Sequence, residues 1–139
     1  GPTAGFSTCD PSKLYLPVDV SPSRPTVEKE INDPASIYSW TKGLLALRAS
    51  VPALGNTGGW KYTSDPQLPY PAVYERFSDD GKYLVIINPR SGKASAEVSG
   101  YKKLEVVYGD PNALSVKKVS GGLSLRIKGV GSVICKVTE

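Results

Sequence analysis

Residues 72–88 have the sequence AVYERFSDDGKYLVIIN, and this stretch decides the fold. Two apolar segments, 72–77 and 82–88, flank a turn in which Gly81 supplies the positive φ that a tight reversal needs. The pattern predicts a β-hairpin. The second segment is continuously apolar from Tyr83 to Ile87, which is typical of a central strand that is covered on both faces.

Further strand-like segments follow this hairpin at short intervals. Most of them alternate apolar and polar residues, and turns rich in glycine separate them; they are 59–63, 94–98, 104–108, 123–127 and 133–137. We therefore expect a mostly β fold, an antiparallel Greek-key-like β-sandwich of about seven to eight strands. This domain should occupy residues 55–139.

One amphipathic helix is predicted before the strands, over about residues 34–51. Asp33 is a good N-cap, Pro34 suits the first helical position, and Pro52 disfavours helical geometry in the residue before it. Apolar residues recur at spacings of three and four and so share one stripe. They are Ile37, Trp40, Leu44, Leu47 and Val51.

The first 32 residues contain five of the twelve prolines, which makes long regular elements unfavourable there. We expect an extended segment with one short helical turn near 27–31. Its apolar patch, residues 14–18, would need support from another surface. Residues 1–54 thus form a Pro-rich segment with a helix, ahead of the sandwich.

Composition excludes several classes of function. The chain has 139 residues and no His, which removes His-based acid–base catalysis, Ser–His and Cys–His pairs and most catalytic zinc sites. We predict no metal and no cofactor. There is also no Met, so we expect a piece of a longer protein.

The net charge is +4, and it arises in residues 72–139, which carry 11 basic and 7 acidic side chains. No run of basic residues exceeds two, whereas a nucleic-acid-binding surface is usually denser, so we expect solvated strand faces and no nucleic-acid partner. No apolar run approaches the ~18 residues of a membrane span, and we expect no membrane partner.

The two cysteines, Cys9 and Cys135, leave two alternatives open. They could form a disulfide, or Cys135, which lies in an apolar alternating run, could be a buried free thiol; the pattern favours the second.

Carboxylates and aromatic residues are the remaining candidates for chemistry. The acidic residues fall at turns, at a cap or at outward strand positions, so we predict no catalytic pair and no catalytic residue in this chain. Four aromatic residues cluster around the first hairpin: Trp60, Tyr62, Tyr70 and Tyr74. They could bind sugar rings, or they could pack against the helix and within the sandwich.

The order of these features resembles the tail of α-amylase-family glycoside hydrolases of the α-glucosidase, oligo-1,6-glucosidase and trehalose-synthase-like type. The resemblance rests on five spaced segments: Ala4-Gly5-Phe6-Ser7, Leu14-Tyr15-Leu16-Pro17-Val18, Asn32-Asp33-Pro34-Ala35-Ser36-Ile37, Leu44-Leu45-Ala46-Leu47-Arg48 and Val51-Pro52-Ala53-Leu54. In that family a helix of this kind closes the catalytic barrel, and a small β-sandwich called domain C follows it.

The resemblance implies a non-catalytic C-terminal region that braces the barrel of a parent enzyme acting on α-glucosidic bonds. The family's catalytic carboxylates lie upstream of such a segment, so this chain alone should be inactive. Its partner would be the missing barrel, and without it the helix face could drive self-association. Two other functions stay open: a module that binds α-glucans on its aromatic surface, and an immunoglobulin-type interaction domain.

Overall fold

The computed structural model describes residues 3–138. The chain forms two compact units, Gly1–Ala46 and Leu47–Glu139, so the division falls inside the long helix rather than after residue 54. The reason is local packing within the second unit. Ala53 and Leu54 are buried there, where they contact the strands.

The first unit has little regular structure. It contains the 3-10 turn η1 (Pro11–Lys13), the short helix α1 (Val27–Asn32) and the first part of α2. The expected helical turn near 27–31 is therefore confirmed, and the Thr26 side chain caps it by accepting a hydrogen bond from the Lys29 N–H. Elsewhere the prolines leave irregular backbone, and Tyr15 and Leu16 are exposed.

Helix α2 extends over Ile37–Ser50, so it begins later than expected. The true N-cap is Ser36, whose Oγ accepts a hydrogen bond of 3.0 Å from the Ser39 N–H. Asp33 instead ends α1 and opens a turn, in which its carboxylate accepts from the Ala35 N–H. Both residues are good caps, but the serine lies where the chain enters α2.

The second unit contains the 3-10 turns η2 (Pro52–Leu54) and η3 (Pro111–Ala113). It also contains eight strands: β1 (Gly59–Tyr62), β2 (Ala72–Ser78), β3 (Gly81–Asn88), β4 (Ala94–Ser99), β5 (Lys103–Tyr108), β6 (Leu114–Val119), β7 (Gly122–Ile127) and β8 (Gly131–Thr138). Seven match predicted segments. The sequence did not indicate β6, because most of its residues are exposed on an edge strand and show no buried alternation.

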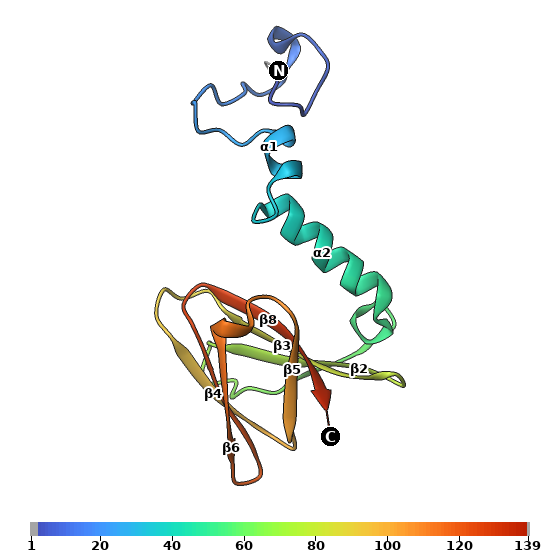
Figure 1. Cartoon of the computed structure of the whole chain (residues 1–139), viewed down its shortest axis with the longest axis vertical. Helices are drawn as coiled ribbons and strands as arrows, with labels where there is room; N and C mark the ends of the chain where they lie inside the picture. Colours follow the sequence, from blue (N-terminus) through green and yellow to red (C-terminus); the bar gives the residue numbers. More distant parts are fainter. Residues whose placement is uncertain (1–2, 139) are drawn as a thin grey trace. The chain divides into compact units, whose positions relative to one another are not determined.

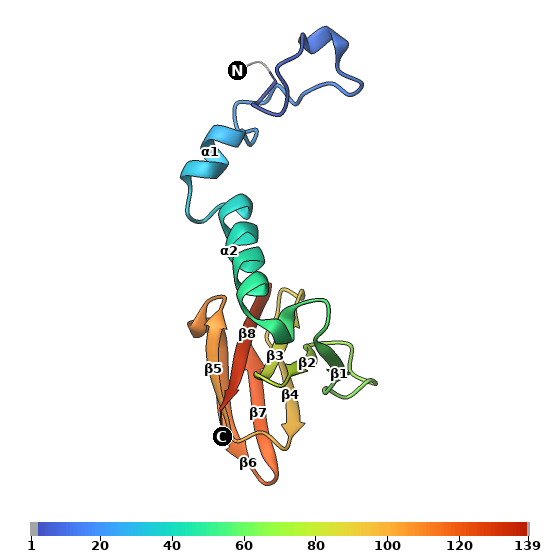
Figure 2. The same ribbon diagram turned by 90° about the vertical axis from the view of Figure 1, so that its right-hand side faces the viewer.

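The strands form a sandwich of two antiparallel sheets (Figures 1 and 2). Sheet A has the order β1-β2-β3-β8-β5, and sheet B has the order β4-β7-β6. The chain crosses between the sheets after β3, β4, β5 and β7, which is a Greek-key-like pattern. The predicted fold class is confirmed.

The core lies between the two sheets. Its fully buried side chains come from both layers and include Val73, Leu84, Ile86, Val98, Leu123, Leu125, Ile127, Val133 and Cys135. The opposite face of β3, with Tyr83 and Val85, is also buried, and η2 packs against this strand. This explains why β3 is apolar at nearly every position.

One carboxylate departs from the expectation that the acids lie at the surface. Glu75 is buried on the inner face of β2, where its Oε2 accepts a hydrogen bond of 2.8 Å from the Tyr101 hydroxyl. Burial, this hydrogen bond and the Glu75 charge raise the pKa of Tyr101, which keeps it protonated as a donor.

The structure places the two cysteines in contrasting surroundings. Both are free thiols; Cys9 is exposed, and Cys135 is buried in the core. Burial raises the pKa of Cys135 to about 12, so its thiol stays neutral at ordinary pH.

We predict that Ellman's reagent modifies one thiol rapidly in the folded chain and two after unfolding, because only the thiolate of an accessible cysteine reacts. Cys9→Ser should abolish the rapid phase. Two rapid equivalents in the folded chain would contradict the burial of Cys135.

Candidate functional site

The predicted helix stripe is exposed or half-buried at every position. Helix α2 has no buried residue: Ile37 is 80% exposed and Trp40 is 46% exposed. Leu44, Leu47 and Val51 are half-buried. Trp40 also makes an interaction with another residue, so it is not without a partner. The stripe therefore leaves apolar side-chain surface exposed, most of all at Ile37.

The apolar surface of α2 is wider than one stripe. Tyr38 and Leu45 are exposed and lie seven residues apart, so they form a second row beside the first. The Lys42 Nζ lies 6.0 Å from the centre of the Tyr38 ring, so this side chain extends the row.

No helix in residues 3–138 is both long and apolar enough to cross a membrane.

Arg76 of β2 fixes the segment that follows α2 to sheet A. Its Nε donates to the Ala53 carbonyl at 3.1 Å, and its Nη2 donates to the carbonyls of Gly55 and Gly58 at 2.6 and 3.2 Å. The planar guanidinium suits this role, because its donors point in fixed directions. We call this arrangement the Arg76 clamp.

Two further features support the Arg76 clamp. Arg48, near the end of α2, donates a short hydrogen bond to the Asn56 side chain in the same segment. Gly58 lies so close to the backbone of Ala53 that a Cβ there would collide with the Ala53 carbonyl oxygen. The exit of α2 is therefore held by three carbonyls, one side-chain contact and one close backbone approach.

Sequence analysis did not single out Arg76. It occupies an ordinary outward position in an alternating strand, and its three acceptors are backbone groups that any residue carries. The only available signal was the run of glycines and small residues at 53–59, which allows the backbone to approach the guanidinium closely.

Three of the four predicted aromatic residues come together on the outer face of sheet A. The register places Tyr62 opposite Tyr74 and Trp60 opposite Arg76. The Trp60 ring centre lies 6.4 Å from that of Tyr62 and 6.3 Å from that of Tyr74, with interplanar angles near 40°. Trp60 is 59% exposed. The rings form a tilted aromatic cluster rather than a flat platform.

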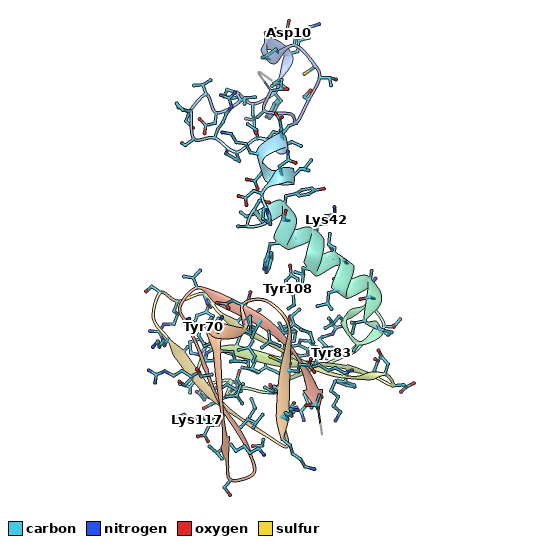
Figure 3. All side chains as sticks on the ribbon, in the orientation of Figure 1. Asp10, Lys42, Tyr70, Tyr83, Tyr108 and Lys117 are labelled. Carbon is cyan, nitrogen blue, oxygen red and sulfur yellow. The ribbon has the colours of Figure 1, made fainter. Side chains whose placement is uncertain are left out.

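Tyr70, labelled in Figure 3, is separate from this cluster. It lines a different depression, together with Ser95 and Glu97 of β4 and Ser124 of β7. The sequence placed it with the others because it lies only four residues before Tyr74, but the loop 65–71 carries it towards sheet B.

The acidic groups do not gather into a site. Residues 3–138 contain no group of three or more His, Cys, Asp or Glu side chains placed to hold a metal ion. Glu75, the buried carboxylate, is engaged by Tyr101 within the core, where a substrate would not reach it.

Comparison with known proteins gives a consistent likeness among solved structures. A variant of trehalulose synthase MutB in complex with Tris matches 97% of this chain with 29% identity and a TM-score of 0.72, and 23% of its own chain is covered. Trehalulose synthase MutB from Pseudomonas mesoacidophila MX-45 matches 89% with 26% identity and a TM-score of 0.66, and 22% of its chain is covered.

The α-amylase from H. orenii has the same fold over 81% of this chain, with 14% identity and a TM-score of 0.63, and 22% of its chain is covered. This chain thus spans less than a quarter of the length of the solved structures it matches. No protein-family model matches the sequence, and the search of curated proteins found no similar sequence.

We predict that Arg76→Met lowers the free energy of unfolding by about 2–4 kcal/mol, because three carbonyls lose a charged donor. Chemical denaturation followed by Trp fluorescence would measure the change. Arg90→Met is the matched control, since that side chain is exposed and should cost less than about 0.5 kcal/mol. Equal effects of the two substitutions would contradict the Arg76 clamp.

Proposed function

The chain resembles a short part of α-amylase-family enzymes, and from this premise we propose that it braces a catalytic barrel. In this proposal it is the non-catalytic C-terminal β-sandwich region of a parent enzyme that acts on α-glucosidic bonds of starch-like oligo- or polysaccharides. The observation that carries the proposal is the exposed apolar surface of α2, on which Ile37 and Leu45 are 80% and 59% exposed.

The energetics of this surface support a bracing role. Fully burying one large apolar side chain contributes about 1.5–3 kcal/mol. Several such residues lie on α2, so docking against a barrel would contribute several kcal/mol, which is comparable to the net stability of a domain. The Arg76 clamp would link the docked helix to the sandwich, because it holds the segment that follows α2 against sheet A.

The identity of the barrel follows from the likeness and not from any catalytic residue of this chain. The matched enzymes are at least four times longer than the part matched, so the remainder of a parent chain would supply the carboxylates. In a retaining mechanism one carboxylate attacks the sugar to form a glycosyl-enzyme intermediate, and the other acts first as acid and then as base for the water that hydrolyses it. The present chain should have no such activity alone.

In the isolated chain, the uncovered face of α2 should bind the uncharged dye Nile red or be buried by self-association. We predict that Ile37→Ser combined with Leu45→Ser lowers dye fluorescence about twofold or more, because both side chains are well exposed. Fluorescence titration and sedimentation velocity would measure the two effects.

Val130→Asn is the control for these substitutions, because Val130 is about as exposed as Ile37, at 78% against 80%, but lies in a loop of the sandwich. A monomer that binds no dye at high concentration would contradict the proposal. The coding sequence upstream of Gly1 provides an independent check: it should encode barrel strands with spaced Asp, Glu and Asp residues, and a different upstream domain would overturn the assignment.

A second candidate function is the binding of α-glucans by Trp60, Tyr62 and Tyr74. The observation that favours it is the high exposure of Trp60 beside two other rings. Aromatic faces cover the C–H-rich faces of sugar rings, and a tilted set of rings suits a curved glucan chain.

If this surface binds glucans, amylose should retard the chain in affinity electrophoresis. Trp60→Ala should weaken that binding about tenfold, because it removes the most exposed ring. Tyr70→Ala is the control and should leave retardation unchanged, since Tyr70 lies apart from the cluster. Absence of retardation in the unmodified chain would contradict this function.

A further inference from the structure

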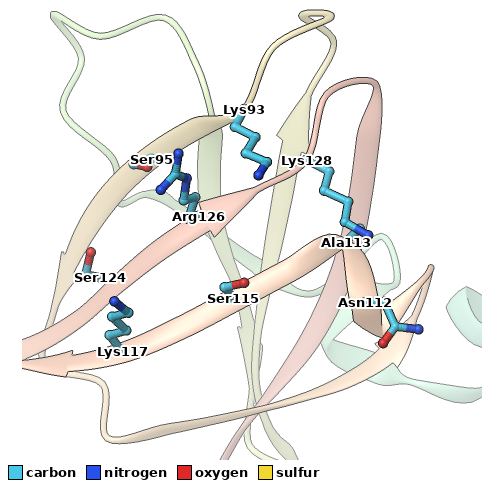
Figure 4. A pocket seen from close by; sticks show the side chains of 9 residues that line it. All are labelled: Lys93, Ser95, Asn112, Ala113, Ser115, Lys117, Ser124, Arg126 and Lys128. Carbon is cyan, nitrogen blue, oxygen red and sulfur yellow. The ribbon is translucent and has the colours of Figure 1, made fainter.

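The outer face of sheet B carries a polar groove of about 390 Å³ that neither proposed function uses. Four cationic and several small polar side chains line it: Lys93, Lys117, Arg126 and Lys128, with Ser95, Asn112, Ser115 and Ser124. Figure 4 shows Lys93, Arg126 and Lys128 gathered towards one end, with Lys117 farther along the strands.

Strand register builds this groove. Arg126 of β7 lies directly between Ser95 of β4 and Ser115 of β6, and Lys117 lies opposite Ser124. Small serines beside long cations leave room above the sheet, while their hydroxyls remain available as donors and acceptors. The intervening residues of β4 and β7 point into the core, so these two strands give the groove a packed floor, while β6 forms its edge.

Three loops are tied together where the lysines gather. The buried Asn88 side chain donates to the carbonyls of Gly92 and Lys128 at 2.9 and 3.0 Å. The Lys128 N–H donates to the Ala113 carbonyl at 2.9 Å, which joins the turn η3. Lys93 and Lys128 therefore extend from backbone that is fixed before any ligand arrives.

The groove concentrates the charge of the protein. Its four cations equal the net charge of the whole chain, +4, so all other ionisable side chains balance. One carboxylate, Glu97 of β4, lies opposite Ser124 at the border of the groove, but no Asp or Glu lines it, and within residues 3–138 these four side chains form no ion pair. Like charges that line one groove repel one another, and a bound anion would relieve that repulsion.

We propose that this groove binds the phosphate monoester of a sugar. The Arg126 guanidinium can donate two parallel hydrogen bonds to phosphate oxygens, and the lysines add point charges around it. The serine hydroxyls and the Asn112 amide suit sugar hydroxyls. The volume lies within the ~300–1,000 Å³ range of small-ligand sites. The groove contains no aromatic ring, which separates it from the Trp60 cluster.

Calorimetric titration of the intact 139-residue chain with glucose 6-phosphate tests the proposal. We expect saturable binding that weakens as salt is added, and that is at least about tenfold tighter than binding of glucose or of inorganic phosphate. Arg126→Gln should weaken it about tenfold or more, because it removes the bidentate donor. Thermal unfolding should be little changed, since these side chains are exposed.

Lys117→Gln and Lys118→Gln form a matched pair for this test. Both remove one charge from β6, but the register places Lys118 opposite Leu123, on the other face of the strand. Only Lys117→Gln should weaken binding. Equal weakening by both would mean a nonspecific effect of net charge and would overturn the proposal. Equal affinity for inorganic phosphate, or binding of a polyanion such as heparin without glucose 6-phosphate, would overturn it as well.

Discussion

The contact of one guanidinium with three backbone carbonyls sets the geometry on which the rest of this structure depends. Arg76 holds the segment that follows α2 against the outer face of sheet A. That segment carries Ala53 and Leu54, and these cover the side of β3 that the second sheet cannot reach. A strand as apolar as β3 needs cover on both faces, since exposed Tyr83 and Val85 would be an aggregation hazard. The clamp therefore makes the helix exit part of the sandwich.

The sequence could predict the parts of the fold that local signals specify. The hairpin at 72–88 was predictable because its turn residues and its apolar run are local signals. The fold class followed from repeated short alternating segments. The edge strand β6 was missed because an exposed strand needs no alternation. The start of α2 was misplaced because Asp33 and Ser36 both suit a cap, and only the preceding helix decides between them.

The candidate sites were less predictable for a different reason. Arg76 binds backbone carbonyls, so no partner residue type marks its role. The Glu75–Tyr101 pair joins residues 26 positions apart, and in the sequence Glu75 resembles an ordinary outward residue of a strand and Tyr101 a residue of a turn. The four cations of the groove extend from residue 93 to residue 128. Sequence showed only that positive charge is concentrated in residues 72–139; strand register was needed to gather it on one face.

A two-layer sandwich builds its core from the inner face of each sheet and leaves both outer faces open to other uses. Here the two outer faces have diverged in chemistry. Sheet A carries the clamped helix exit and an aromatic cluster at its β1 edge, both suited to apolar contact. Sheet B carries cations and serines without an aromatic side chain in its groove, which suits only a charged or polar ligand. Because a strand sends alternate side chains to opposite faces, changes on either outer face leave the core residues in place. The proposed bracing contact and the proposed anion site therefore draw on different side chains and do not compete for the same face.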